Sequence, residues 1–572
     1  MLVGRISVVL GCIVSLVGAS PTCPLDGPVF PKPRLLSQSD AIKAAVANLT
    51  STFANITAGA QNYSLSVQVF SADEEEPLFS VSHTAPNLPP NTTGVRRVDE
   101  NTVFRLGSLT KIFTIYAFLI NAGEKYWHEP VTNYIPELQA VANQSDPVSD
   151  IDWNDITLGG LATQMTGIPR EYALLGELTQ SSETRDNVVQ YGFPPLAQDQ
   201  KPPCGAYPTC DRAQFFAGII SFYPSLAPYE TPAYSNVAFQ LLGYALETIT
   251  GKSFTSLVQD SIINPLGLNN TSLRAPRASR GIIPGNQTAT GWSFDIGESV
   301  AAGNMYSSAS DISNLGRAIL SNKLLSPVVT RRWLKPFAFS SDPLAMVGMP
   351  WGARRIKLED TYRYTTAYNK AGNIGDYSSL LAIMPDFNVG ISILVAGELP
   401  PNVGFGLADI IGEPLLPALE AAARAEAGSL YSGHYSFHDS SINSSMTITT
   451  DDLPGMSISQ WFSNGTDFRW ISTVLQNQYT PVTPRIRLYP TGLEGPGTDG
   501  VGKRVAFKAM FEDADSPRRD GRMFSTECGS WVSIESVIYG SAAMDELIFN
   551  LDAEGKVLSV TSPSLRITLD KE

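Results

Sequence analysis

The chain has 572 residues, which is long for one ordinary domain, so we expect two or three domains. Hydrophobic residues make up 43% and charged residues 17%, the balance of a soluble globular protein with a large core. The formal net charge is −15 and the sequence has no Lys/Arg-rich run, which argues against nucleic acids and anionic membrane surfaces as partners.

The first residues have the pattern of a secretory signal peptide. Arg5 supplies the positive charge, residues 6–17 are apolar, and Val17-Gly18-Ala19 offers a cleavage site of small residues. A short membrane anchor is the alternative, but the apolar run is shorter than a membrane span requires, and no later stretch is long enough. We therefore predict a signal peptide over 1–19 and a secreted protein, extracellular or in a secretory lumen.

N-glycosylation sequons support the same route. Such triplets also arise by chance in a Ser/Thr-rich chain, so they support the signal peptide without proving it. The candidate acceptors are Asn48, Asn55, Asn62, Asn91, Asn143, Asn269, Asn270, Asn286, Asn443 and Asn464.

Cysteines fit an oxidising compartment. Cys12 lies in the predicted signal peptide, and the four that remain are Cys23, Cys204, Cys210 and Cys528. Three pairings are possible. The short gap favours a Cys204–Cys210 disulfide, which leaves Cys23 with Cys528.

No metal or cofactor is predicted. The sequence has no CxxC and no Cys/His cluster, and the i, i+4 pair His434 and His438 lies in a strand-like stretch without a partner motif.

The N-terminal elements follow from hydrophobic spacing. Apolar residues over 41–57 recur on one helix face, with Asp40 as a candidate N-cap. Residues 63–70 alternate like a strand, and 78–82 could pair with them across the acidic turn 74–76.

A helix with a serine and a lysine at its start follows. Ser108 and Lys111 are three residues apart and so share a helix face, and 112–120 is apolar nearly all round. Such a pair can be a nucleophile and its base. An isolated S-x-x-K match is more often a solvated pair, so the interpretation depends on the rest of the chain.

A mixed region and a β-rich region complete the chain. Residues 156–330 are mostly helical in pattern, with a surface loop at about 193–210, and two apolar strands, 380–384 and 389–395, precede a helix over 405–427. From about 430, short alternating stretches separated by Gly/Pro/Asp turns predict an antiparallel β-domain. We predict a signal peptide (1–19), an α/β domain (20–428) with an inserted α-subdomain (about 156–295), and a C-terminal β-domain (429–572).

Two further motifs follow Ser108 in order. Tyr234-Ser235-Asn236 precedes a helical run, and Lys370-Ala371-Gly372 stands at the end of a strand-like stretch. Each triplet is common alone, but their order and their positions at element boundaries make them informative together.

With these motifs the chain resembles the serine β-lactamase/penicillin-binding protein superfamily, and is most similar to class C β-lactamases, family S12 peptidases and related esterases. The resemblance covers about 38–425, and fungal secreted β-lactamase-like proteins share the layout with a C-terminal β-domain. It implies an antiparallel sheet flanked by helices plus an inserted all-α subdomain. The further similar segments are 104–108, 156–169, 234–268 and 301–308.

The resemblance implies roles for the motif residues. Ser108 would attack a carbonyl while Lys111 accepts its proton, which requires burial beside Lys370 to lower a pKa that is ordinarily about 10.4. Tyr234 would be the second proton carrier, its phenolate favoured by both lysines, and Asn236 would hold Lys111 and a substrate carbonyl.

The same resemblance assigns the oxyanion hole to the backbone N–H groups of Ser108 and Asn373, beside Gly372. Competing serine chemistries fit poorly, because the sequence has no G-x-S-x-G elbow and its four histidines have no triad-like context.

One departure bears on substrate choice. Ala371 stands where the family usually has Thr or Ser, whose hydroxyl helps bind a substrate carboxylate, so we expect an ester-like substrate rather than a β-lactam. Asp376 would add repulsion against anions if its side chain faces inward. The Cys204–Cys210 loop could roof the cleft.

We therefore predict a secreted, glycosylated serine hydrolase that forms an acyl-enzyme on Ser108 and cleaves a small-molecule ester or amide. One alternative is an acyltransferase or tailoring enzyme of natural-product biosynthesis with the same nucleophile. The other is a binding protein that keeps the fold without turnover.

Overall fold

The computed structural model describes residues 23–572 apart from 143–145, 181–186, 207, 359–362, 440–441, 477–481, 499, 516–522 and 524–527. The predicted signal peptide and the Asn143 sequon lie outside the described residues. The chain forms two compact units. The larger unit comprises Arg34–Ile356 and Thr366–Leu419, and the C-terminal unit comprises the described residues up to Pro33, Lys357–Thr365 and Glu420–Glu572.

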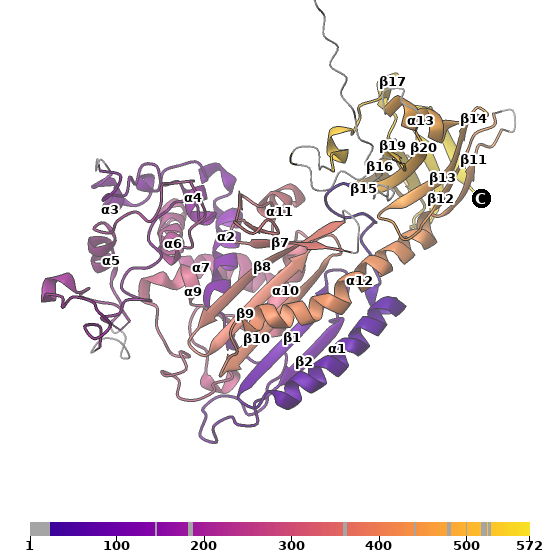
Figure 1. Ribbon diagram of the computed structural model, residues 1–572. Helices are drawn as coiled ribbons and strands as arrows, with labels where there is room; N and C mark the ends of the chain where they lie inside the picture. Colours follow the sequence, from indigo (N-terminus) through magenta and orange to yellow (C-terminus); the bar gives the residue numbers. More distant parts are fainter. Residues whose placement is uncertain are drawn as a thin grey trace, which may run out of the picture. The chain divides into compact units, whose positions relative to one another are not determined.

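An eight-stranded sheet forms the centre of the larger unit (Figure 1). The predicted pairing of the first two strands is confirmed, and the two predicted apolar strands, β9 and β10, pair with each other; both pairs are antiparallel. The strands, in sheet order, are β2 (Phe79–His83), β1 (Tyr63–Ser71), β10 (Val389–Gly397), β9 (Tyr377–Met384), β8 (Tyr364–Ile374), β7 (Gly352–Lys357), β6 (Ala345–Val347) and β5 (Ala338–Phe339).

Helices cover both faces of this sheet, which explains why β9 and β10 are buried along their whole length. Successive β9 side chains point to opposite faces. Leu381 lies beside Gly316 of α10 (Ala309–Leu320), and Leu380 lies beside Gly404 of α12 (Val403–Tyr431). α1 (Asp40–Gly59) packs on the same side as α12 (Figure 1). The predicted helices over 41–57 and 405–427 are confirmed.

Helices are the main regular elements between β2 and β5, but they cover less than half of it, so the prediction that 156–330 is mostly helical is only partly met; most of 193–210 is loop, as predicted. A short two-stranded sheet joins β3 (Phe104–Arg105) to β4 (Tyr306–Ser307). The remaining helices are α2 (Thr110–Asn121), α3 (Pro136–Gln139), α4 (Leu158–Ala162), α5 (Arg212–Ile219), α6 (Asn236–Thr250), α7 (Phe254–Val258), α8 (Asn264–Leu266), α9 (Val300–Gly303) and α11 (Pro327–Trp333).

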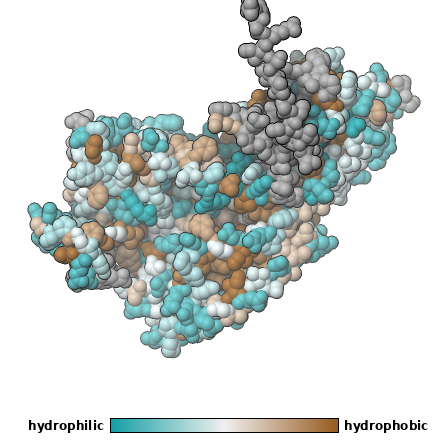
Figure 2. Space-filling view, in the orientation of Figure 1, coloured by the Kyte–Doolittle hydropathy of each residue, from teal (hydrophilic) through white to brown (hydrophobic). Residues whose placement is uncertain are grey.

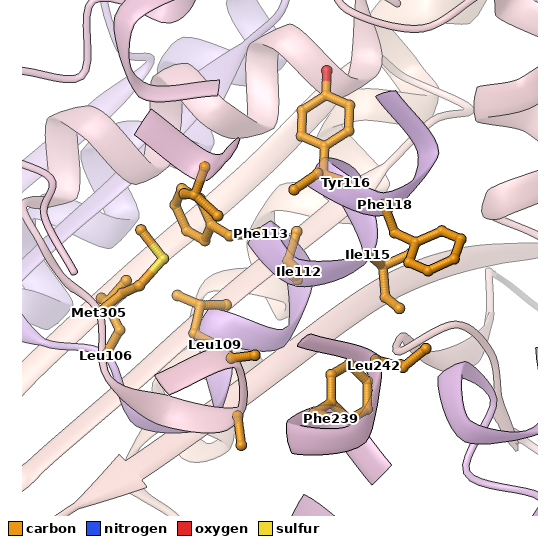
Figure 3. Packing of buried hydrophobic residues seen from close by; sticks show 14 of the residues in the cluster. Leu106, Leu109, Ile112, Phe113, Ile115, Tyr116, Phe118, Phe239, Leu242 and Met305 are labelled. Carbon is orange, nitrogen blue, oxygen red and sulfur yellow. The ribbon is translucent and has the colours of Figure 1, made fainter. Parts of the chain in front are cut away.

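Helix α2 runs through the main hydrophobic core. Its residues from Thr110 to Leu119 are all buried, as the apolar pattern predicted. Figure 3 shows Phe239 and Leu242 on one side of this helix and Met305 beside Leu106 at its start. Packing on every side fixes the helix, and with it the residues of its first turn.

The C-terminal unit is built on a nine-stranded sheet with its own core. Its strands pair antiparallel, so the prediction of short antiparallel strands from about residue 430 is confirmed. Its elements are β11 (Gly433–Ser436), β12 (Ser445–Thr449), β13 (Met456–Ser463), β14 (Thr466–Asp467), α13 (Phe468–Gln476), β15 (Pro484–Pro496), β16 (Lys503–Asp513), β17 (Ile538–Tyr539), β18 (Ala542–Ala543), β19 (Glu546–Leu551), β20 (Val557–Ser562) and β21 (Ile567–Lys571).

The N-terminal segment differs from the sequence-based division. We assigned residues 20–33 to the α/β domain, whereas the structure groups those from Cys23 to Pro33 with the C-terminal unit. Two contacts within that unit explain the grouping. Cys23 is disulfide-bonded to Cys528, and its backbone N–H donates to Glu512 at 2.7 Å.

Hydrophilic residues predominate on the face drawn in Figure 2, with hydrophobic residues in separate patches. Among the described residues, no helix combines the length and apolar character needed to cross a bilayer.

Candidate active site

Ser108 lies in a tight turn directly before α2. The turn depends on Gly107, whose φ of +53° is the left-handed region. A Cβ on Gly107 would lie 2.8 Å from the carbonyl oxygen of Asn373, and one on Gly372 would lie 2.7 Å from the Ser108 nitrogen. The two glycines therefore let the end of β8 run directly against the Ser108 turn.

Lys111 occupies the first turn of α2 and is fully buried. Its Nζ lies 3.2 Å from Ser108 Oγ, 2.5 Å from Asn236 Oδ1 and 2.7 Å from the Ala302 carbonyl oxygen. Two of these neighbours can only accept hydrogen bonds. A neutral amine would donate its two N–H bonds to them and present its lone pair to the Ser108 hydroxyl.

The surroundings of Lys111 favour that neutral form. Burial lowers the pKa of Lys111 well below its ordinary value, and the positive charges of Lys370 and Arg170 lower it further. The carboxylate of Glu171 acts in the opposite direction without reversing the shift. The predicted effect of burial and Lys370 on this pKa is therefore present.

Tyr234 and Asn236 are placed by the start of α6. Ser235 is its N-cap and accepts from the Ala238 N–H at 3.0 Å, while its hydroxyl donates to the Pro169 carbonyl at 2.7 Å. Gln164 accepts from the Ser235 N–H at 2.5 Å. The turn is thus held by the segment that ends at Pro169.

Tyr234 contacts the nucleophile directly. Its hydroxyl donates to Ser108 Oγ at 2.7 Å, and the Nζ of Lys111 lies 5.0 Å from its ring centroid. Burial raises the pKa of Tyr234 to about 12, and the hydrogen bond with Ser108 and the charge of Arg170 only partly oppose this. The expected phenolate is therefore disfavoured at neutral pH, and Tyr234 carries its proton.

Lys370 lies within β8, which continues to Ile374, so its motif ends two residues before the strand does. Its Nζ donates to the Ala371 carbonyl at 2.6 Å and lies 5.4 Å from the Tyr234 ring centroid. Burial and the charge of Arg170 lower the pKa of Lys370 to about 7. The tyrosine therefore has three basic side chains around its ring, since the guanidinium carbon of Arg170 lies 4.8 Å from the centroid.

Two cavities border this cluster. The larger, about 940 Å³, is lined by Ser108, Asn236 and Asn373 together with Glu171. The smaller, about 330 Å³, is lined by Tyr234, Lys370 and Ala371 and by the apolar side chains Met346, Val347, Trp351 and Phe405. The hydrogen bond from Tyr234 to Ser108 therefore joins residues of both cavities.

Sequence reasoning missed Arg170 and Glu171. Asn236 donates from Nδ2 to Glu171 Oε1, while its Oδ1 accepts from Lys111. Burial raises the pKa of Glu171. The available signal was two charged residues directly after Pro169, the end of the segment that resembles the family.

The Cys204–Cys210 loop and Asp376 were both expected to influence the cleft. Both disulfides, Cys204–Cys210 and Cys23–Cys528, are present, and Ala206 of the former loop lines the larger cavity. The side chain of Asp376 is not among the lining residues of either cavity.

The remaining candidates lie elsewhere. No group of three or more His, Cys, Asp or Glu side chains suited to a metal ion occurs in the described part of the chain. The sequon residue Asn270 is partly buried, and the other described ones are exposed: Asn48, Asn55, Asn62, Asn91, Asn269, Asn286, Asn443 and Asn464.

Comparisons with known proteins find relatives along most of the chain. The chain is 29% identical to a "Beta-lactamase-like protein" of Arthroderma benhamiae over 96% of both chains, and 28% identical to a "Probable hydrolase M10" of Phoma sp. over 89% of this chain and 85% of that one. A solved "Beta-lactamase/D-alanine Carboxypeptidase from Yersinia pestis" is 21% identical, with a TM-score of 0.46, over 65% of this chain and 98% of that one.

Family models divide the chain in two. Residues 423–572 match the model described as "Beta-lactamase-like-like, C-terminal domain", and residues 89–413, more than half of the chain, match the model described as "Beta-lactamase". The chain therefore belongs to the β-lactamase family, a hydrolase family of the serine β-lactamase/penicillin-binding protein superfamily.

Proposed function

We propose that this protein is a secreted serine hydrolase that forms an acyl-enzyme on Ser108 and cleaves an ester or amide of a small molecule. The observation that carries the proposal is the hydrogen-bond arrangement around Ser108. The Oγ atom lies 3.2 Å from Lys111 Nζ and accepts from the Tyr234 hydroxyl at 2.7 Å. One neighbour can take the serine proton and the other has a proton to give.

Acylation would begin with attack of Ser108 Oγ on the substrate carbonyl while its proton moves to the lone pair of Lys111. The oxyanion would form in the larger cavity, which the backbone of Ser108 and Asn373 borders. Each N–H donor directed at such an oxygen contributes about 10²–10³ in rate.

Breakdown of the tetrahedral intermediate would use Tyr234. Its proton would pass to the leaving alcohol or amine, and the phenolate formed would be stabilised by the nearby cations and recover a proton from the Lys111 ammonium. Deacylation would run in the reverse sense, with water in place of the leaving group. This sequence starts from the protonated tyrosine that burial favours.

The smaller cavity supports the preference for esters. Ala371 offers no hydroxyl to a substrate carboxylate, and the neighbouring Met346, Val347 and Trp351 present apolar surface. Because Tyr234 and Lys370 also border this cavity, we place the leaving group there. Lys370 and Arg354 also line this cavity, so the preference for an ester over a β-lactam rests on the missing hydroxyl of Ala371 alone.

Secretion and glycosylation belong to the same proposal. Two disulfides support an oxidising compartment, and exposed sequon asparagines such as Asn48 and Asn286 are accessible to modification. Mass spectrometry of the protein purified from a eukaryotic secretory host, before and after glycosidase treatment, tests both statements.

Fluorophosphonate labelling tests the nucleophile. We expect wild type to be labelled and to turn over p-nitrophenyl acetate faster than nitrocefin, and Ser108→Ala to lose labelling and turnover. Ser299→Ala is the matched control, because Ser299 also borders the larger cavity but donates to Gln240. Labelling that survives Ser108→Ala would place the nucleophile elsewhere, and rapid nitrocefin hydrolysis would contradict the ester preference.

Two other outcomes would favour the alternatives. An acyltransferase would give more ester or amide product than free acid when an alcohol or amine is added. A binding protein without turnover would show neither labelling nor hydrolysis in wild type.

A further inference from the structure

Glu171 carries an inference about the acyl half of the substrate. It is the one acidic or basic side chain among the described residues that line the larger cavity, where it accompanies the nucleophile Ser108. Of the basic side chains of the site, Lys370 borders the smaller cavity, Lys111 is fully buried, and Arg170 is exposed and lines neither cavity. The larger cavity therefore presents a carboxylate to whatever occupies it.

Asn236 fixes where this carboxylate points. The Asn236 amide is held at both ends, because its oxygen accepts from Lys111 and its nitrogen donates to Glu171 Oε1. The sequence-based expectation gave that amide nitrogen to a substrate carbonyl. Here one of its two N–H bonds is already used, and the second oxygen of Glu171 has no hydrogen bond among those of the described residues.

The site consequently offers an acceptor, the Glu171 carboxylate, beside the nucleophile, in addition to the remaining N–H of Asn236. An acyl group with a carbonyl or carboxylate at this position would face the Glu171 carboxylate without a proton between them. An acyl group with an ammonium group would form a charge-assisted hydrogen bond there.

We propose that Glu171 is a specificity-determining residue that selects acyl groups carrying an amine close to the scissile carbonyl. This inference rests on the proposed acyl-enzyme chemistry at Ser108. It assigns the amine-bearing half of the substrate to the larger cavity and leaves the alcohol or amine leaving group to the smaller one.

Neighbouring charges do not cancel the preference. The positive charges nearest to Glu171 are those of Lys111 and Arg170, and both act on its carboxyl group. A buried Lys111 that is neutral adds no charge, and Arg170 lies over the ring of Tyr234. Net attraction for an ammonium group therefore depends on Glu171 being ionised, a form that burial disfavours and that the hydrogen bond from Asn236 and the charges of Lys111 and Arg170 favour.

A pair of esters of matched shape tests the proposal. Phenyl 3-aminopropanoate and phenyl butanoate differ in an ammonium group against a methyl group and share one leaving group. We expect wild type at pH 7 to prefer the amine by about tenfold in kcat/KM, the ratio typical of one charge-assisted contact. In Glu171→Gln the ratio should fall to about one, because the amide can still accept from Asn236 but carries no charge.

Matched variants separate specificity from positioning. Glu171→Asp keeps the charge and should keep the sign of the preference. Glu177→Gln removes a carboxylate from the same segment, one that accepts from Thr179 and does not line the cavity, and should leave the ratio unchanged. The rate of fluorophosphonate labelling shows whether each variant keeps an intact nucleophile.

The remaining outcomes separate a failure of the inference about Glu171 from a failure of the proposed function. If wild type hydrolyses both esters without preference, or Glu171→Gln slows both equally, the inference is wrong while the proposed hydrolase stands. If wild type is neither labelled nor active on either ester, the proposed function itself fails.

Discussion

Buried lysines in the two units have opposite surroundings. In the larger unit, Lys111 and Lys370 are 0% and 8% exposed, and the groups within hydrogen-bond reach of their amines are uncharged oxygens. In the C-terminal unit, Lys508 is also 8% exposed but contacts Glu535 at 2.9 Å, Asp545 at 3.1 Å and Glu546 at 2.6 Å.

The protonation states of these three lysines follow from the difference in their surroundings. Burial disfavours the charged form at all three lysines, yet hydrogen bonds to the three carboxylates raise the pKa of Lys508, whereas burial with nearby cations lowers the pKa of Lys111 and Lys370. The C-terminal unit has a cation that stabilises structure. The larger unit has amines that can take up protons at neutral pH.

The largest expected effect comes from Lys111→Met. Because this change removes the proposed base, we expect kcat/KM for p-nitrophenyl acetate to fall by about 10³–10⁴. Thermal stability should be unchanged or higher, since a buried amine without a carboxylate partner is replaced by an apolar side chain of similar length. A large loss of stability with activity retained would show that this lysine is structural.

Lys508→Met is the reciprocal change. It leaves the buried carboxylate of Asp545 without its cation, so we expect the C-terminal unit to lose about 2–3 kcal/mol of stability. Hydrogen exchange of the β16 and β19 amides would measure this as faster local opening, with esterase activity unchanged. Unchanged exchange would mean that water replaces the lysine at no cost.

An effect of intermediate size is expected on the pH dependence of kcat/KM. Arg170 lowers the pKa of both Lys111 and Lys370, so Arg170→Gln lets each lysine keep its proton to a higher pH. The acidic limb of kcat/KM, which reports loss of the proton from the base, should therefore move upward by about 0.5–1 unit. Arg331→Gln, an exposed cation on α11, is the control. A shift to lower pH would contradict the neutral-amine assignment.

The smallest effect is expected from Ala371→Thr. A hydroxyl at this position could donate to an anionic leaving group beside Lys370, a contact that corresponds to about tenfold in rate. The ratio of nitrocefin to p-nitrophenyl acetate turnover should rise accordingly. Ala345→Thr, which borders the same cavity away from Lys370 and Tyr234, should leave the ratio unchanged. An unaltered ratio in Ala371→Thr would show that the missing hydroxyl does not limit β-lactam turnover.

Much of the architecture could be predicted because it depends on local patterns. An alternating stretch predicted β1, a possible pairing across an acidic turn predicted β2, and two apolar runs predicted β9 and β10. Apolar spacing predicted α1, and an Ala/Glu-rich stretch predicted α12. A short cysteine spacing favoured the Cys204–Cys210 disulfide that the structure contains. The grouping of 23–33 with the C-terminal unit was missed although the pairing of Cys23 with Cys528, 505 positions away, was predicted, because the domains were drawn as continuous stretches of sequence.

The residues of the candidate site also differ in how far local sequence predicts them. Ser108 and Lys111 could be paired from sequence, because positions three apart meet on any helix. Glu171 was not assigned, since its contact with Asn236 joins residues 65 positions apart and its place directly after Pro169 is a weak signal by itself. The predicted phenolate at Tyr234 counted the cations and left out the opposing effect of burial.

By itself, the sequence determined the residue types that can do the chemistry, their order, and the helices and strands that carry them. Only the tertiary structure decided their protonation and the charge of the space around them. The physical reason is that a pKa depends on which distant segments exclude water and which charges they bring. For Lys111 these include Asn236, 125 positions away, and Lys370, on another strand.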